Sequence, residues 1–545
     1  MEDRADQKQD LEGLRETLRQ VERRLARVEH SLGMSSGDEA DGGREAVKAH
    51  TGAEDVELEF RIGELWLGQM GVVALLIGIA FFISYSFGPA FPPVLQIVAG
   101  YLGAGGFFLL SRRWNTSHPN TSRILLAGSL SLLYFATLRL HFFTRMPIVP
   151  QKAVGLGLLV LVLGFLIGVA IARRSQGLAS LALVLGLVTS LCSDTSHFAL
   201  AMMAATSAAA VFLGLAYSWT WAAIISGALV YPAHLIWMLN NPVLGRPVQA
   251  VPEHHFNLVY LFVCAGLFGL LTLFRRREKD PDAPGVVISL LNVAGFYAVS
   301  VAVGATYFRA LFAEVNFLVA VFFMALAVLH WVHRQARFST ALYACSGYIA
   351  LSVAIVARFD SPERFIWLGW QSLLVICTAI WFRSKTLVVA NLFIYLGILL
   401  LYLLVEAPDL GVNLSYAAVA LLSARVMNWK KERLTIRTEL MRNVYLGSAF
   451  VIIPYGLYHR VPRDYVSLSW LGAGFFYYGM SIVLRNRKYR WMAILTLFLT
   501  ILHVLVVDLA GLNPVLRMIS FLALGVGLMV LSWLYARNRR QASHG

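Results

Sequence analysis

Apolar runs long enough to cross a lipid bilayer follow one another along most of this chain, and they constrain its fold more than any other feature. A transmembrane helix needs about 20 mostly apolar residues to cross a hydrocarbon core of roughly 30 Å. We count about 18 such runs, at 65–87, 94–111, 122–143, 152–172, 177–192, 197–216, 219–239, 255–274, 285–307, 312–332, 339–357, 365–382, 386–405, 411–427, 441–459, 466–484, 490–508 and 515–536. None of them alternates apolar and polar residues as a barrel strand does. The sequence therefore predicts an all-α fold, a polytopic transmembrane helical bundle of about 18 spans within residues 61–540.

The charge distribution predicts the orientation of these spans. Only 14% of the residues are charged and 58% are hydrophobic, yet the net charge is +15. In a soluble protein such a charge would suggest a nucleic-acid partner, whereas membrane proteins collect Lys and Arg in cytoplasmic loops. With the N-terminus in the cytoplasm, the inner connections and C-terminal tail carry 25 Lys and Arg and the outer connections carry 8, counting the two adjoining residues of each span. We therefore expect both termini to be cytoplasmic, the lipid bilayer to be the main partner, and no nucleic acid to bind.

The N-terminal segment has a heptad pattern. Apolar residues recur at alternating spacings of three and four, at Leu11, Leu14, Leu18, Val21, Leu25, Val28 and Leu32. This seam predicts a short cytoplasmic coiled coil over residues 1–32 that joins copies of the chain into a homo-oligomer, or else an amphipathic helix that packs on its own chain. Residues 33–60, rich in small and acidic residues, are expected to form a flexible linker. Because the chain opens on charged residues, we expect no cleaved signal peptide.

Two sequence blocks resemble a known family. The first, GELWLGQMGVVALLIGIAFFISYSF, begins at Gly63 and precedes a proline-containing turn and a glycine-rich run. The second, ARRSQGLASLALVLGLVTSLCS, begins at Ala172. Together they resemble the bacterial family of predicted polytopic membrane proteins called domain of unknown function 2339, of which this chain looks like a shortened form. The resemblance implies a location in the bacterial inner membrane and assigns no functional residue.

Ionisable residues within the spans are the candidates for a functional site, because charge is costly at membrane depth. Five of them fall in the predicted outer half of the bilayer: Arg139, His234, Glu314, His503 and Arg517. They suggest a periplasm-facing substrate pocket, and Pro232 beside His234 would allow the broken helix common at transporter sites. The alternative is that each group snorkels or pairs locally. Near the inner face, snorkelling accounts for His330.

Metal and catalytic patterns are weak in this sequence. Glu253, His254 and His255 carry ligand atoms in one outer connection, yet adjacent loop histidines seldom chelate, and the cysteines form no CxxC pair. The zinc-protease, P-loop and nucleophile-elbow motifs are absent. We expect no catalytic residue, no metal and no cofactor.

Three functions remain open from the sequence. The first is a transporter or flippase for a component of the cell envelope, with a periplasm-facing polar pocket. The alternative is a membrane scaffold or assembly protein that recruits or oligomerises partners through the coiled coil. An integral-membrane transferase is the third, and the first outer connection, GPAFPP, lacks the carboxylate that one class of such enzymes uses. A transporter should contain a cavity that reaches the membrane midplane, and a scaffold should be filled.

Overall fold

The computed structural model describes residues 93–117, 119–143, 147–193, 195–251, 256–275, 283–334, 336–429, 438–508, 515, 518 and 521–530. Within these residues the secondary structure is helical and contains no strand. The predicted coiled coil at 1–32, the linker at 33–60 and the first apolar run at 65–87 lie outside the described residues. The chain divides into two compact units, Met1–Ile148 and Val149–Gly545, and each is described by itself.

Among its described residues, from 93 onward, the first unit contains two packed helices, α4 (Pro93–Arg113) and α5 (Pro119–Arg139). Small polar side chains join them, as expected where helices associate without a hydrophobic driving force in lipid. Ser129 Oγ donates to the carbonyl of Ala104 at 2.7 Å, and the Tyr101 hydroxyl lies 3.1 Å from Thr137 Oγ1. These contacts fix how α4 and α5 face each other.

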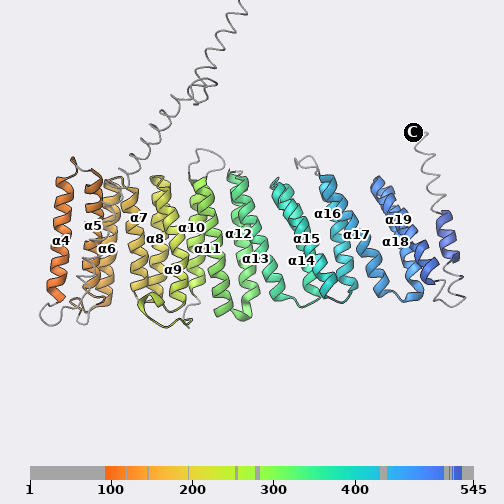
Figure 1. Ribbon diagram of the computed structural model, residues 1–545, viewed down its shortest axis with the longest axis horizontal. Coiled ribbons are helices and arrows are strands. Elements are labelled where there is room, and N and C mark those ends of the chain that lie inside the picture. Colours follow the sequence, from red (N-terminus) through yellow and green to blue (C-terminus); the bar gives the residue numbers. More distant parts are fainter. Residues whose placement is uncertain are drawn as a thin grey trace, which may run out of the picture. The chain divides into compact units, whose positions relative to one another are not determined.

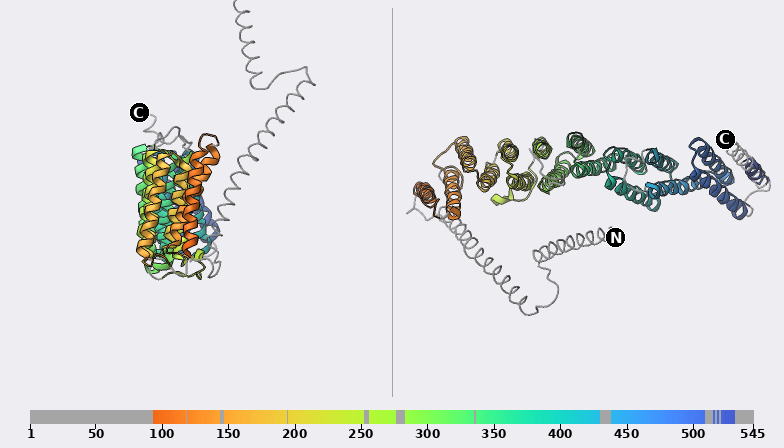
Figure 2. Two further views of the ribbon diagram at one scale, coloured as in Figure 1. Left: turned by 90° about the vertical axis from the view of Figure 1, so that its left-hand side faces the viewer. Right: turned by 90° about the horizontal axis from the view of Figure 1, so that it is seen from above.

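The second unit is a series of helices, whose bounds are α6 (Lys152–Ala172), α7 (Gln176–Cys192), α8 (Ser196–Ala216), α9 (Thr220–Met238), α10 (Asn257–Phe274), α11 (Ala283–Tyr307), α12 (Phe312–Arg334), α13 (Arg337–Arg358), α14 (Glu363–Trp381), α15 (Lys385–Val405), α16 (Leu410–Trp429), α17 (Thr438–Arg460), α18 (Val466–Val483) and α19 (Arg487–His503). A π-helical turn, Val504–Asp508, follows α19. A shorter apolar helix is described at Phe521–Val530. Successive helices of this unit run antiparallel (Figures 1 and 2).

Fourteen of the described helices are long and apolar enough to cross a membrane. The apolar helix α7 is shorter, and α17 carries Glu439, Arg442 and Arg460. The expected runs from 94–111 to 490–508 each coincide with one helix. The all-helical fold, with many helices long and apolar enough to be spans, is thus confirmed in the described part of the chain, and the count of about 18 spans remains a prediction.

Three connections on the predicted inner side share one backbone conformation. Arg174, Arg383 and Arg485 adopt a positive φ of 47–50°. A left-handed residue at this position ends a helix by turning the next amide back to the last free carbonyls. Accordingly, the amide of Ser175 donates to the carbonyl of Ala170 at 3.0 Å. The residue after each arginine then caps the next helix with its side chain: Ser175, Ser384 and Asn486. The charge that predicts a cytoplasmic loop therefore lies in a tight helix-to-helix turn.

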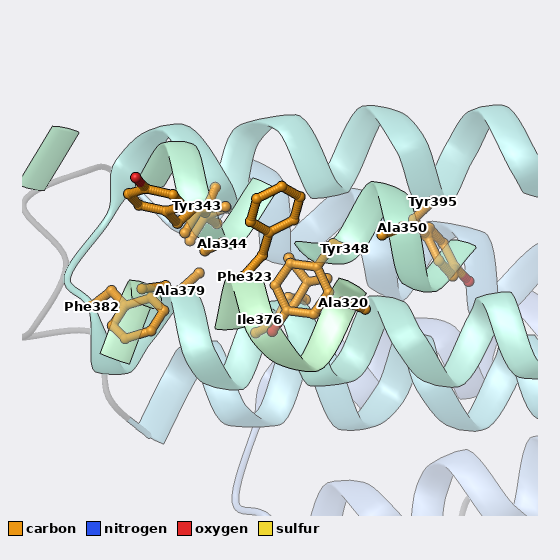
Figure 3. Packing of buried hydrophobic residues seen from close by; sticks show 14 of the residues in the cluster. Ala320, Phe323, Tyr343, Ala344, Tyr348, Ala350, Ile376, Ala379, Phe382 and Tyr395 are labelled. Atoms are coloured by element: carbon orange, nitrogen blue, oxygen red, sulfur yellow. The ribbon is translucent and has the colours of Figure 1, made fainter. Parts of the chain in front are cut away.

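The core of the second unit is built from contacts between helices close in sequence, mostly each helix with the next one or two. Figure 3 shows Phe323, Tyr348 and Ile376 packed between α12, α13 and α14. Gly347 lets α12 and α13 approach closely, because a Cβ there would lie 3.2 Å from the carbonyl oxygen of Ala320. Large apolar side chains also cover the outside of the unit, for example Leu161 with 70% exposure. A surface this apolar fits a lipid environment.

Candidate functional site

Arg139 is the last residue of α5, in the first unit. Its side chain is 8% exposed, and Nη1 is buried without a hydrogen-bond partner. Arg517 lies outside the described residues. The other three candidates, His234, Glu314 and His503, belong to the second unit and have separate surroundings there.

His234 lies in a filled interior. It is 0% exposed, with Nδ1 2.5 Å from Asn257 Oδ1 and Nε2 3.7 Å from Cys264 Sγ. The Cys264 sulfur also accepts a hydrogen bond from Ser207 Oγ at 3.6 Å. Both ring nitrogens of His234 therefore have partners on one neighbouring helix, α10, which is the local pairing that the sequence left open as the alternative.

A second group of buried polar side chains lies beside the first. The Tyr231 hydroxyl donates to Asn292 Oδ1, and Asn292 Nδ2 donates to the Tyr343 hydroxyl at 3.0 Å. Thr272 Oγ1 lies 3.1 Å from His330 Nε2, so His330 is buried by local pairing and does not snorkel to the inner face. Because an amide holds its protons, Asn292 interrupts a proton relay through these groups. The arrangement therefore favours helix-to-helix adhesion.

His503 ends α19 against α17 and α18. Its Nδ1 lies 3.1 Å from Ser467 Oγ, and its ring centroid lies 5.0 Å from that of Trp470. Trp470 Nε1 donates to the carbonyl of Pro454 in α17 at 3.0 Å. His503, like His234, is thus surrounded by packed side chains.

Glu314 is the candidate that lines open space. It lies in the first turn of α12, on the wall of a groove of about 500 Å³ between α12, α13 and α14. The groove is mostly apolar, with Trp367, Trp370 and Leu374 of α14 facing Phe317 and residues of α13. Cavities of roughly 300–1,000 Å³ are typical of sites for small organic ligands. We call this space the lateral groove.

A polar recess adjoins the lateral groove. It measures about 360 Å³ and is lined by Arg309, Glu314 and Arg358 together with alanines and Phe312. Glu314, Arg358 and Ala313 line both spaces, so the recess and the groove share one wall. Arg358 ends α13 and Glu314 begins α12, and both charges suit the helix dipoles at those ends. These helix ends lie on the side predicted to be periplasmic.

A third space continues the groove toward the middle of the helices. Gln371 lines the lateral groove and also a cavity of about 180 Å³ between α13, α14 and α15. Its Nε2 donates to the Tyr348 carbonyl and to Ser352 Oγ, each at 2.9 Å. Gln371 lies eight residues beyond Glu363, the first residue of α14, which corresponds to about 12 Å along the helix. Asn391 and Ser372 bring further polar atoms to this cavity.

Sequence reasoning missed most of the residues around Glu314. Arg358 was counted only as a charge in an outer connection, and Trp367, Trp370 and Gln371 were not singled out. The tryptophans near the start of α14 were a usable signal, because Trp gathers at membrane interfaces and amphiphile sites. The sequence did not predict which side chains of α12, α13 and α14 would face the same space. Within the described residues, no group of three or more metal-ligand side chains occurs.

No family model, no curated protein and no solved structure matches this chain. The resemblance to the family named domain of unknown function 2339 therefore remains an expectation from the sequence.

Proposed function

We propose that this chain is a multi-pass protein of the bacterial inner membrane that transports or flips an amphiphilic component of the cell envelope. One observation carries the proposal: an apolar groove and a charged recess share Glu314 and Arg358 at one end of α12 and α13. An amphiphile needs both environments side by side, an apolar one for its chain and a polar one for its head.

The cavity beyond Gln371 supports movement as well as binding. Ser352, Ser372 and Asn391 provide polar atoms there, so a headgroup leaving the recess would meet hydrogen-bonding partners deeper in the membrane. A polar group in hydrocarbon without such partners would cost several kcal/mol. The proposed path runs along α14, from the recess past Gln371 toward the midplane.

Filling the groove tests this proposal. Leu374, which is 50% exposed and lines the groove, is replaced by Trp in the full chain, and transbilayer movement of a fluorescent phospholipid is measured in proteoliposomes. Leu161→Trp is the matched control, because Leu161 is a lipid-exposed leucine at similar depth in α6 and lies apart from the groove residues. We expect Leu374→Trp to slow the movement at least severalfold and Leu161→Trp to leave it unchanged. Equal rates for the wild type, both variants and empty liposomes would exclude the proposal.

The alternative function is a membrane scaffold or assembly protein. The packed surroundings of His234 and His503 favour it, because these buried polar groups join helices and line none of the three spaces described above. In that case the predicted coiled coil at residues 1–32 would gather copies or partners in the cytoplasm. Absence of phospholipid movement above that of empty liposomes, together with a stable oligomer of the full chain, would favour this alternative.

The proposal includes the finer features expected from the sequence: about 18 spans, both termini in the cytoplasm and a homo-oligomer formed through the seam that runs from Leu11 to Leu32. The asymmetry of 25 to 8 in Lys and Arg supports the orientation.

A further inference from the structure

We infer that the lateral groove and its recess bind a phospholipid whose headgroup carries both a phosphate and an ammonium, as in phosphatidylethanolamine. The inference names the substrate class of the proposed function and rests on the same site. Its basis is the charge pattern of the recess, which Arg309 and Arg358 line together with Glu314.

The charged groups of the recess are available to a ligand. Glu314 and Arg358 line the same space, yet they form no ion pair with each other within 4.0 Å, although both lie in the described part of the chain. Arg309 is held in place by a hydrogen bond of 3.1 Å from Nε to the carbonyl of Ala305. A phosphate between the two guanidinium groups and an ammonium beside the carboxylate would satisfy all three charges. A purely anionic headgroup would leave the Glu314 carboxylate without a positively charged partner. A purely cationic headgroup would leave both arginines without a negatively charged partner.

The apolar groove provides for the acyl chain. Trp367 stacks on Phe359 with ring centroids 5.2 Å apart, which gives the groove a flat aromatic wall close to the recess. Trp370 and Leu374 continue this wall along α14, and they are 40% and 50% exposed. A chain lying here from a headgroup in the recess would run in the direction of a lipid in the outer leaflet.

The two lipid features can be tested separately on the full chain in detergent, with binding measured by native mass spectrometry. Four probes are titrated: dihexanoyl phosphatidylethanolamine, dihexanoyl phosphatidylglycerol, dihexanoylglycerol without phosphate, and glycerophosphoethanolamine without acyl chains. We expect phosphatidylethanolamine to bind most tightly. The phosphate-free and chain-free probes should bind at least about tenfold more weakly, because each loses a charge-assisted contact or the apolar burial.

Single substitutions with matched controls test which recess residue contacts the phosphate and which contacts the ammonium. Arg358→Gln should weaken both phospholipids about tenfold or more, whereas Arg460→Gln, an exposed arginine in the last turn of α17, should leave them within about twofold. Glu314→Gln should weaken phosphatidylethanolamine and spare phosphatidylglycerol. Its control is Glu363→Gln, in the first turn of α14. Thermal unfolding of each variant reports whether it is folded.

Equal affinity for the four probes, or an unchanged affinity of folded Arg358→Gln for phosphatidylethanolamine, would overturn the inference. The result also separates it from the proposed function. If the lipid binds as expected while Leu374→Trp leaves flipping unchanged, the transport proposal fails and the binding site stands. If Leu374→Trp blocks flipping while all headgroups bind alike, the headgroup inference fails and transport stands.

Discussion

Replacing His234 by Leu should destabilise the protein through one identifiable hydrogen bond. The ring is 0% exposed, and its Nδ1 lies 2.5 Å from Asn257 Oδ1. Asn257 is also 0% exposed, and its Nδ2 has no hydrogen-bond partner. In the His234→Leu variant both polar atoms of the Asn257 side chain would therefore be buried and unpaired. The contact to Cys264 Sγ at 3.7 Å is weaker and should matter less.

The expected loss of stability follows from these buried atoms that the substitution leaves unpaired. Leaving a buried polar group unsatisfied costs about 1–3 kcal/mol, and hydrogen bonds between membrane helices average about 0.6 kcal/mol with a maximum near 1.7. We expect His234→Leu to lower the free energy of unfolding by about 1–2 kcal/mol. Asn257→Leu should cost less, because it also removes an unpaired donor. The double variant should lose about 1 kcal/mol less than the sum of the single losses.

The assay is reversible unfolding of the full chain in bicelles, with the four members of the double-mutant cycle compared at one protein concentration. His330→Leu combined with Asn257→Leu is the control cycle, because His330 pairs with Thr272 and should show coupling close to zero. Additive losses in the His234–Asn257 cycle would refute the reasoning. So would an unchanged stability of His234→Leu accompanied by lost lipid flipping, since that result would make His234 a functional residue.

Three further outcomes are expected. Gly295→Ala should lower the free energy of unfolding by about 1–3 kcal/mol, because the new Cβ would lie 2.6 Å from Tyr231 Cγ. Gly266→Ala, whose Cβ would meet nothing within 4 Å beyond its own helix backbone, should not lower it in the same unfolding assay. Reporter fusions at Gly411 and at the C-terminus should give a periplasmic and a cytoplasmic signal, respectively; a periplasmic C-terminus would contradict the topology of about 18 spans. A cysteine introduced at Leu18 should crosslink to its copy in another chain, and no crosslink under oxidising conditions would exclude a parallel homo-oligomeric coiled coil.

Much of the fold could be predicted because it depends on the local amino-acid composition of each run. In lipid, the backbone N–H and C=O groups of a run such as 152–172 can form hydrogen bonds only within their own helix. Length and apolarity therefore suffice to locate α6. The same holds for α8 and α15, which were expected at nearly the observed bounds. The excess of Lys and Arg at alternate connections likewise depends on position along the chain alone. The sequence therefore determined the helices and predicts their orientation.

The site depended on which helices became neighbours. Glu314, His234 and His503 looked alike in the sequence, as single ionisable residues in apolar runs. Tertiary packing gave His234 the partner Asn257 and gave His503 the partner Ser467, while Glu314 lines the groove and the recess together with Arg358. Apolar side chains on these helices cover both the core and the outside, so hydropathy cannot tell which face meets another helix. That choice is made by side-chain shape and by a few interhelical hydrogen bonds, which exist only once the helices have packed.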